Sequence, residues 1–361
     1  MENLVRTTML NNLLEFQGKK ILVTGHTGFK GTWLSRTLVL AGAEVHGIAL
    51  AAENSSLYSR ISDLGIHSST LLDIRNRSAV EDYFNGMAFD GVFHLAAQPL
   101  VLKSYEQPVE TFETNVMGTV HLLNSIIKNS ASNWVVLITT DKVYQNFETT
   151  KGYKETDALG GKDPYSASKS SAEMAISAWR TIAEFNGSKV KLCSARAGNV
   201  IGGGDRSENR LIPDLVRSFS ANRPATIRNP NSLRPWQHVL DPISGYLAIG
   251  KFYSQGKKVA YSYNFGPGIE SKLSVHDVAK IASSVWGEFA SLQLEIDNDK
   301  PPESELLWLS STAAFKDLAW KNKLNALEAI QWTIDMEKLL TANNPKDTLD
   351  KQIINFFMGD I

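Results

Sequence analysis

The sequence has almost no cysteine, no long apolar run and no excess of charge of either sign. Its 361 residues include a single cysteine, Cys193, so no internal disulfide is expected, which is typical of a reducing compartment. Lysine and arginine together number 37 and aspartate and glutamate 38, a formal net charge of −1 that gives no indication of a nucleic-acid or membrane partner. No apolar segment approaches the length that spans a bilayer. These absences predict a soluble, cytoplasmic protein.

Two further absences narrow the class of protein. Residues 1–20 lack an apolar core followed by a cleavage site, so we expect a short leader to the fold and no signal peptide. The seven histidines are scattered at positions 26, 46, 67, 94, 121, 238 and 276 without the close spacing of metal ligands, so we expect no metal site. Cys193 lies in an apolar-alternating segment and is expected to be a buried core residue.

The most informative feature that is present is a glycine-rich turn between a predicted strand and a predicted helix. Residues 21–23 form an apolar run typical of a buried strand, and residues 32–41 have a helical pattern. Glycines spaced G-x-x-G-x-x-G at such a junction let backbone N–H groups approach a pyrophosphate at the helix N-terminus. The alternative is a glycine-rich turn that binds nothing. The cofactor residues predicted in this turn are Gly25, Thr27, Gly28, Phe29, Lys30 and Gly31.

Strand-like and helix-like segments alternate through the first half of the chain. The predicted strands are residues 20–24, 44–50, 91–95, 134–139 and 189–196, and the predicted helices are residues 32–41, 78–85, 111–129 and 166–185. This alternation predicts an α/β fold with a Rossmann-type, doubly wound parallel sheet, whose ligands lie beyond the carboxyl ends of the strands.

The pattern loosens from about residue 200, where glycines and prolines separate short elements, and helical patterns return at residues 275–286 and 324–340. We predict a dinucleotide-binding domain of residues 1–201 with a returning segment near 236–265. Residues 202–235 and 266–361 are predicted to form a smaller C-terminal α/β lobe that binds the substrate.

The second predicted strand bears on the choice of cofactor. Dinucleotide folds usually carry an acidic residue at its end for the adenosine ribose, but Ala49 stands there. Residues 49–53 also lack the arginine that would pair with a 2′-phosphate, so NAD is favoured over NADP, with looser adenosine binding. Asp73 follows another predicted strand and is a candidate acceptor for the adenine amino group, or equally a turn or helix-capping aspartate.

Tyr165 and Lys169 lie four residues apart in a predicted helix, so their side chains share one face. A nearby ammonium stabilises phenolate and is expected to lower the pKa of Tyr165 from about 10. Such a tyrosine can accept a proton from a hydroxyl group while hydride leaves the same carbon for nicotinamide.

Polar residues also follow the strand predicted at residues 134–139. Thr140 is a candidate hydrogen-bond partner for the substrate hydroxyl. Asp141 would act as an acid if burial raises its pKa, and Lys142 would act as a base if its pKa is depressed. The alternative is a polar turn with an exposed ion pair.

Taken together, these motifs resemble the extended short-chain dehydrogenase/reductase family over nearly the whole chain, most of all its CDP-glucose 4,6-dehydratases. The stretches that carry the resemblance are residues 25–31 (GHTGFKG), 94–101 (HLAAQPLV), 115–119 (NVMGT), 140–142 (TDK), 163–169 (DPYSASK), 196–205 (RAGNVIGGGD), 227–230 (IRNP) and 234–239 (RPWQHV).

The resemblance implies an intramolecular redox dehydration of a nucleotide-activated hexose. Tyr165 would deprotonate the C4 hydroxyl, assisted by Thr140 and Lys169, while the C4 hydride passes to NAD. The 4-ketone then acidifies the C5 proton, Asp141 protonates the departing C6 hydroxyl, and hydride returns to C6. Lys142 stands where the dTDP-glucose dehydratases have a glutamate base.

The resemblance also implies binding residues, a CDP-hexose substrate and a homodimer formed through residues 111–129 and 166–185. Further cofactor contacts are implied at Asp73, Ile74, Ala96, Ala97 and Gln98. Substrate contacts are implied at Ser104, Asn199, Arg210, Arg228, Arg234 and Glu303. Arg210 and Arg228 are equally compatible with exposed salt bridges. In the family a histidine usually precedes this glutamate, but here Pro302 precedes Glu303. This difference leaves open whether Glu303 contacts the ribose or the base, and which nucleotide base is preferred.

Three other functions remain open at this point. A nucleotide-sugar 4-epimerase would share the cofactor and Tyr165 but would not need an acid and a base beside Thr140. A dehydratase for another nucleotide sugar, of the dTDP-hexose or NADP-dependent GDP-mannose type, would share the dehydration. A non-catalytic dinucleotide-binding scaffold would often have lost Tyr165 or Lys169.

Overall fold

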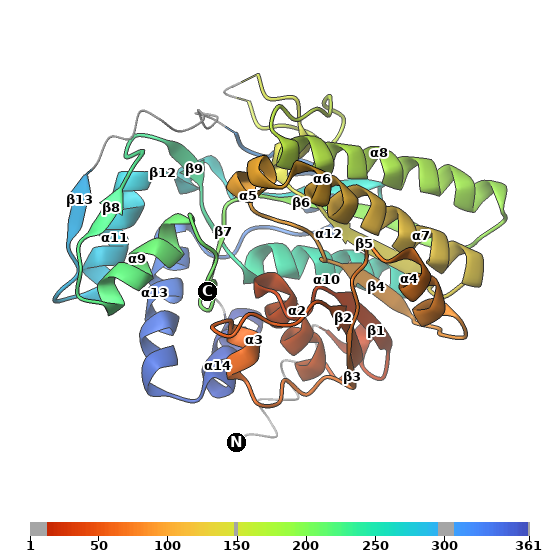
Figure 1. Ribbon diagram of the computed structural model, residues 1–361, viewed down its shortest axis with the longest axis horizontal. Helices are drawn as coiled ribbons and strands as arrows, with labels where there is room; N and C mark the ends of the chain where they lie inside the picture. The colour runs from red at the N-terminus through yellow and green to blue at the C-terminus, as the bar shows by residue number, and fades with distance from the viewer. Residues whose placement is uncertain (1–12, 148–150, 295–306, 360–361) are drawn as a thin grey trace.

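The centre of the protein is a seven-stranded parallel sheet with the strand order β11-β6-β5-β4-β1-β2-β3 (Figure 1). The computed structural model describes residues 13–147, 151–294 and 307–359. The strands of the sheet are β1 (Lys20–Thr24), β2 (Glu44–Ala49), β3 (Ser68–Leu71), β4 (Gly91–His94), β5 (Trp134–Ile138), β6 (Lys191–Ala197) and β11 (Ser262–Phe265). The predicted Rossmann-type fold is confirmed, and each predicted strand is present within two residues of its expected limits.

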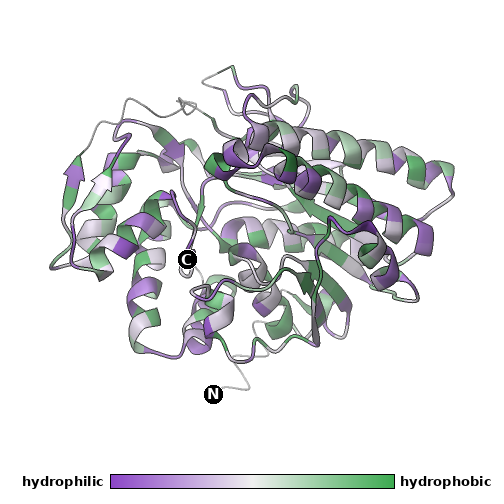
Figure 2. Ribbon diagram, viewed as in Figure 1, coloured by the Kyte–Doolittle hydropathy of each residue, from purple (hydrophilic) through white to green (hydrophobic). Residues whose placement is uncertain are grey.

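Successive side chains of the strands point into two hydrophobic layers, one on each face of the sheet. On β5, Val136 packs into one layer, and Val135 and Leu137 pack into the other. A strand buried on both faces reads as a continuous apolar run, and the strands are accordingly among the most hydrophobic parts of Figure 2.

Helices cover both faces. One layer contains α2 (Phe29–Leu40), α10 (Leu240–Ser254), α12 (Thr312–Leu318) and α14 (Pro345–Met358). The other contains α4 (Arg77–Phe84), α7 (Gly118–Asn129) and α8 (Pro164–Phe185). The buried Cys193 belongs to the first layer, as predicted, and burial raises the pKa of its thiol.

The strand order reverses between β1 and β4, because β2 and β3 continue to one side of β1 and the later strands continue to the other. In sheets of this type the loops after the two central strands separate at this point and leave room for a ligand. The turn after β1 and the loop after β4 are therefore the place to look for a dinucleotide.

Besides the two layers on the sheet, a further hydrophobic cluster lies beyond the sheet, at the left of Figure 1. It contains α9 (Leu211–Ser220), β8 (Ala225–Ile227), α11 (Val275–Trp286), β13 (Leu292–Leu294) and α13 (Ala326–Ala342). Short strand pairs connect it to the main unit: β7 (Val200–Ile201) with β10 (Gln237–His238), and β9 (Leu233–Pro235) with β12 (Lys272–Ser274). This cluster supports a separate lobe, although α12 and α14 pack with the sheet.

The helix predicted at residues 111–129 is interrupted. It consists of α6 (Pro108–Phe112), a π-helical turn η2 (Glu113–Met117) and then α7. The remaining short elements are η1 (Leu14–Phe16), α3 (Leu57–Arg60), α5 (Val101–Glu106), η3 (Asp141–Val143) and η4 (Ile269–Ser271). Among the described residues, none of the helices is long and apolar enough to cross a bilayer.

Candidate active site

The glycine-rich turn connects β1 to α2 and leaves no room for a side chain at Gly25 or Gly31. Gly25 has a φ of +72°, and a Cβ atom there would lie 2.8 Å from the Ala96 nitrogen. A Cβ atom at Gly31 would lie 2.0 Å from the Gly25 carbonyl oxygen. Helix α2 begins directly after Gly28, which is exposed. No side chain of the described residues caps the N-terminus of this helix. This cradle fits a dinucleotide pyrophosphate, because backbone N–H groups at the start of α2 are left to bind it.

The loop after β4 is fixed against this turn by two side chains. Thr24 Oγ1 accepts the Ala96 N–H at 3.1 Å. The Asn115 amide accepts the Gln98 N–H at 2.8 Å, donates to the Gln98 carbonyl at 3.1 Å and donates to Ser168 Oγ at 2.9 Å. Asn115 lies in the 115–119 stretch but was not predicted as a site residue. It belongs to the π-helical turn η2, a geometry often found at functional sites.

The end of β2 carries Ala49, as expected, and a group of uncharged polar side chains lies nearby. His26 Nε2 is 2.7 Å from Ser69 Oγ, and the His26 ring lies edge-on to the Tyr58 ring at 5.4 Å. His26 packs so closely on β2 that a Cβ atom at Gly47 would lie 2.5 Å from its ring. Sequence reasoning missed these residues, which reach the end of β2 from the turn, α3 and β3.

Asp73 is engaged by a neighbouring cation. Its carboxylate accepts from Arg75 at 2.6 Å and from the Arg75 backbone N–H at 2.9 Å, and Arg75 also contacts Glu110 at 2.9 Å. The hydrogen bonds from Arg75 hold the pKa of Asp73 below its usual value. Ile74 follows directly, and its side chain packs on Gly118, where a Cβ atom would lie 2.5 Å from it. The adenine contact predicted for Asp73 and Ile74 stays a prediction.

Tyr165 and Lys169 lie on the buried face of α8, within the first two turns of the helix. Burial raises the pKa of Tyr165 to about 12, and a hydrogen bond with the Thr140 side chain acts in the opposite direction. The expected depression of the Tyr165 pKa is therefore wrong for this structure, because burial outweighs the stabilising contacts. Lys169 Nζ lies 3.4 Å from the Ile138 carbonyl oxygen, and burial lowers the pKa of Lys169 to about 8.

Thr140 and Asp141 are buried at the end of β5, which contradicts the alternative of an exposed polar turn. Thr140 is 6% exposed and Asp141 4%. The Thr140 hydroxyl donates to Asp141 Oδ1 at 2.9 Å and accepts the Lys142 N–H at 3.3 Å, which caps the turn η3. The Asp141 carboxylate fills the space above Gly198, where a Cβ atom would lie 1.9 Å from Oδ2. Lys142 is only partly buried.

Lys30, predicted as a cofactor residue, lies among the charges of the catalytic region. Its pKa is lowered to about 8, first by burial and then by the positive charge of Arg210, while Asp141 opposes the shift. Arg210 in turn forms an ion pair with Asp205 at 3.1 Å. The chain thus brings Lys30 from the glycine turn and Arg210 from the second lobe into the same electrostatic environment as Asp141.

The remaining predicted substrate residues have different surroundings. Ser104 is buried, donates to the Val101 carbonyl at 2.6 Å and accepts the Tyr165 N–H at 3.1 Å, so it is bonded to the start of α8. The sugar contact predicted for Ser104 stays a prediction. Asn199 has a left-handed backbone, with a φ of +49°, at the turn between β6 and β7.

Two arginines of the second lobe are bonded locally. Arg228 donates to Asn209 at 3.2 Å, and Arg234 donates to the Leu233 carbonyl at 2.9 Å. Glu303 lies outside the described residues. The predicted contacts of all three with a substrate stay predictions.

The structure also brings together three potential metal ligands that the sequence analysis treated as scattered. Glu44 Oε1 lies 2.8 Å from His46 Nε2 and 3.9 Å from His67 Nε2. Glu44 begins β2, so this group lies at the end of the strand opposite to the glycine turn. It is not part of the candidate active site.

Comparison with known proteins identifies the family. Residues 22–333 match the family described as GDP-mannose 4,6 dehydratase. The chain belongs to this family. The chain is also 44% identical over 350 residues to a CDP-glucose 4,6-dehydratase of Salmonella typhimurium, an alignment that covers 95% of this chain and 97% of that protein. The resemblance to the extended short-chain dehydrogenases/reductases is thereby confirmed.

More distant relatives share the fold. A UDP-glucose 4-epimerase 2 of Oryza sativa is 27% identical, with 87% of this chain and 81% of that protein covered. The crystal structure of a UDP-glucose 4-epimerase of Thermus thermophilus in complex with NAD superimposes with a TM-score of 0.75 at 24% identity, over 88% of this chain and 98% of that one. The buried Thr140–Asp141 pair has therefore to be interpreted in a fold that serves both dehydratases and epimerases.

Proposed function

We propose that this protein is an NAD-dependent hydro-lyase, a nucleotide-sugar 4,6-dehydratase. Its preferred reaction would convert CDP-glucose to CDP-4-keto-6-deoxyglucose. The observation that carries this proposal is the buried carboxyl group of Asp141, which is hydrogen-bonded to Thr140 and acts on the pKa of Tyr165. Oxidation and reduction at C4 alone require no acid at this position, whereas loss of the C6 hydroxyl does.

The proposed cofactor is NAD. The cradle of Gly25, Gly28 and Gly31 supports a bound dinucleotide, and residues 49–53 contain no arginine for a 2′-phosphate. Bound NAD supplies a hydride acceptor for the first step and a hydride donor for the last. Because the same hydride returns to the sugar, the proposed reaction consumes no external reductant.

The proton transfers are assigned to four side chains. Tyr165 acts in its phenolate form, in which it would be stabilised by the Lys169 ammonium and by the hydrogen bond with Thr140. The phenolate accepts the proton of the C4 hydroxyl and becomes the neutral phenol. Once the 4-ketone has formed, Lys142 accepts the proton from C5 and Asp141 gives a proton to the departing C6 hydroxyl, which leaves as water. When the hydride returns to C6, a proton returns to C5 from Lys142, which completes the 4-keto-6-deoxy product.

The diphosphate of the substrate is assigned to the junction of the two lobes. Arg210 shares the environment of Asp141 with the predicted cofactor residue Lys30, and its positive charge suits phosphate oxygens. Asn199, Arg228 and Arg234 are retained as further contacts, since they lie in the segments that connect the sheet with the second lobe.

We also propose a homodimer formed by α6, η2, α7 and α8. Large apolar side chains on these elements are exposed, among them Val109 (71%), Met174 (58%) and Phe185 (90%). The helices α7 and α8 run side by side along one edge of the molecule (Figure 1), which suits a four-helix interface with a second copy. Equilibrium sedimentation tests this: Met174→Glu should yield monomers, and a monomeric unmodified protein would contradict the proposed dimer.

The cellular role follows from the proposed product. A 4-keto-6-deoxy sugar nucleotide is a precursor for deoxysugars, and we propose that it serves lipopolysaccharide or related polysaccharide synthesis. The single buried cysteine supports a cytoplasmic location.

A substrate panel tests the proposed function. The purified protein is incubated with NAD and, separately, CDP-, dTDP-, GDP- and UDP-hexoses, and the products are analysed by mass spectrometry and NMR. We expect loss of water only from the CDP-hexose, with a ketone at C4. A C4-inverted hexose that retains its water would instead identify a 4-epimerase.

A further inference from the structure

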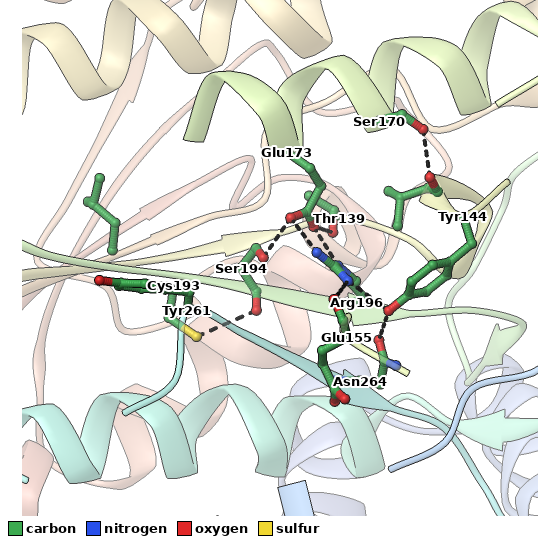
Figure 3. A network of polar contacts seen from close by, with 12 residues as sticks. Thr139, Tyr144, Glu155, Ser170, Glu173, Cys193, Ser194, Arg196, Tyr261 and Asn264 are labelled. Atoms are coloured by element: carbon green, nitrogen blue, oxygen red, sulfur yellow. Dashed lines mark hydrogen bonds and ion pairs between the residues drawn. The ribbon is translucent and has the colours of Figure 1, made fainter. Parts of the chain in front are cut away.

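A buried ion pair between Glu173 on α8 and Arg196 on β6 is the centre of a polar network beneath the active site (Figure 3). The pair is bidentate: Arg196 Nε donates to Glu173 Oε1 at 2.9 Å and its terminal nitrogen donates to Oε2 at 2.9 Å. Ser194 adds a third bond to the carboxylate at 2.8 Å. Both charged residues are only 4% exposed.

The network forms hydrogen bonds with the two residues that flank the catalytic segment, residues 140–143. Thr139, immediately before it, donates to Glu173 Oε1 at 2.6 Å. Tyr144, immediately after it, accepts from Arg196 at 2.7 Å and donates to Asn264 at 2.7 Å. The flanks of the segment that carries Thr140, Asp141 and Lys142 are therefore both bonded to one ion pair.

The same ion pair acts on Lys169. Glu173 follows Lys169 by four residues on α8, so the two side chains lie one helical turn apart. The negative charge of Glu173 raises the pKa of Lys169 against burial, which lowers it to about 8. The other groups that face Lys169 are Tyr165 on α8, the Ile138 carbonyl on β5, His94 on β4 and Lys30 on α2. Glu173 is the group in this set that favours the ammonium form by its charge.

A buried ion pair is a poor way to gain stability, because desolvation of the two charges offsets most of their attraction. Packing alone would be satisfied by apolar side chains of the same volume. What apolar side chains would not supply is a fixed negative charge beside Lys169 and two anchors for the segment at residues 140–143.

We propose that Glu173 and Arg196 are positioning residues of the active site: they hold the catalytic segment against α8 and place a carboxylate one helical turn from Lys169. This inference rests on the proposed function for its effect on turnover. Its electrostatic part concerns Lys169 alone and is testable without a substrate.

The test compares three variants of the full-length protein. Glu173→Gln keeps a hydrogen-bonding side chain but removes the charge. Thr139→Val removes one anchor without a change of charge. Asp350→Asn disrupts the Arg36–Asp350 ion pair between α2 and α14, which is 2.6 Å long and distant from Lys169 in the fold, and serves as the matched control.

The first readout is the pKa of Lys169, measured by competitive acetylation across a pH series and mass spectrometry of the peptide that contains it. We expect Glu173→Gln to lower this pKa by about one unit or more, because a favourable neighbouring charge is lost. Thr139→Val and Asp350→Asn should leave it unchanged. An unchanged Lys169 pKa in folded Glu173→Gln overturns the electrostatic part, whatever the substrate proves to be.

The second readout is the pH profile of kcat with CDP-glucose. Glu173→Gln should move the alkaline limb to lower pH, since the ammonium is lost earlier, while Thr139→Val should lower kcat at every pH. Wild-type kcat and profile in both variants would overturn the positioning role. If Glu173→Gln does not fold, the double variant Glu173→Gln/Arg196→Met removes both buried charges. It is expected to lower the Lys169 pKa in the same direction but by less, because the opposing positive charge of Arg196 is removed as well; a wild-type Lys169 pKa in it overturns the electrostatic part.

Discussion

The carboxyl edge of the sheet has two halves that present different chemical groups to a ligand. Beyond β1 and β2 the surface is formed largely by glycine backbone, by the uncharged Ala49 and by the polar side chains around His26, with Lys30 as its titratable cation. Beyond β5, and on the first turns of α8, buried ionisable groups gather, among them Asp141, Tyr165 and Lys169. Backbone N–H groups do not titrate, so the glycine backbone of the first half can hold a pyrophosphate without regard to pH. The second half depends on the protonation state of each side chain.

This difference predicts that substitutions in the two halves fail in different ways. A change in the glycine half should alter cofactor affinity and leave the order of chemical steps intact. A change in the ionisable half should leave the cofactor bound and stop the reaction at an identifiable step.

Tyr165→Phe should have the largest effect on the ionisable half. Without the phenol, the C4 hydroxyl has no proton acceptor, and formation of the ketone should fall by about 10²–10⁴-fold. Isothermal titration should show unaltered NAD affinity. Tyr83→Phe on α4 is the matched control and should retain full turnover; a comparable loss there would remove the case for Tyr165.

Asp141→Asn, in the same half of the site, should separate formation of the 4-ketone from the loss of water. The 4-ketone should still form, but water loss from C6 should slow by about 10²-fold or more, because the proton donor is missing. NMR of quenched reactions should then detect a 4-keto sugar that keeps its C6 hydroxyl. Dehydration at the wild-type rate would show that the acid is another group.

Gly31→Ala tests the glycine half. Its Cβ atom would lie 2.0 Å from the Gly25 oxygen, against 3.3 Å for a Cβ atom at Gly28. Overpacking of this kind costs about 1–3 kcal/mol, so NAD affinity should fall roughly tenfold or more in Gly31→Ala and less in Gly28→Ala. Equal losses in the two variants would contradict the close-packed turn.

Acid should destabilise the protein through two buried histidines. Burial lowers the pKa values of His94 and His238 to about 3, while their unfolded values stay near 6.5. The unfolded chain therefore binds more protons below pH 6.5, and stability present above that pH should be lost as the pH falls toward 3. Between pH 7.5 and 5.5 the two contribute a loss of up to about 3 kcal/mol.

Urea unfolding at about pH 7.5 and about pH 5.5 measures this loss of stability, which is the smallest of the expected effects. His238→Gln should reduce the pH dependence by about half, since one of the two buried imidazoles is then absent. An unchanged dependence in that variant would show that His238 is not the group responsible.

The sequence predicted the sheet well because each central strand is buried on both faces and reads as an apolar run. It also placed Gly25, Thr140, Asp141 and Tyr165 at strand ends and on one helix, since local patterns determine these positions. It did not predict the π-helical turn that carries Asn115, because such a turn depends on what the side chain bonds across the loop after β4.

The errors concern properties that arise only from the assembled fold. The pKa of Tyr165 was expected to fall because Lys169 is near in sequence, whereas the balance of burial and charge depends on every element around it. The Glu173–Arg196 pair joins residues 23 positions apart and has no local signal.

The most direct test of the proposed dehydration is to label the hydrogen atom at C4 of the sugar and to locate the label in the product. CDP-glucose carrying deuterium at C4 is incubated in ordinary water with the protein and NAD, and the product is examined by NMR. We expect the deuterium to appear at C6 of a 4-keto-6-deoxy product, since the hydride removed from C4 returns to the same molecule. Deuterium retained at C4 of an inverted hexose, or a dehydrated product whose C6 carries none, would contradict this expectation.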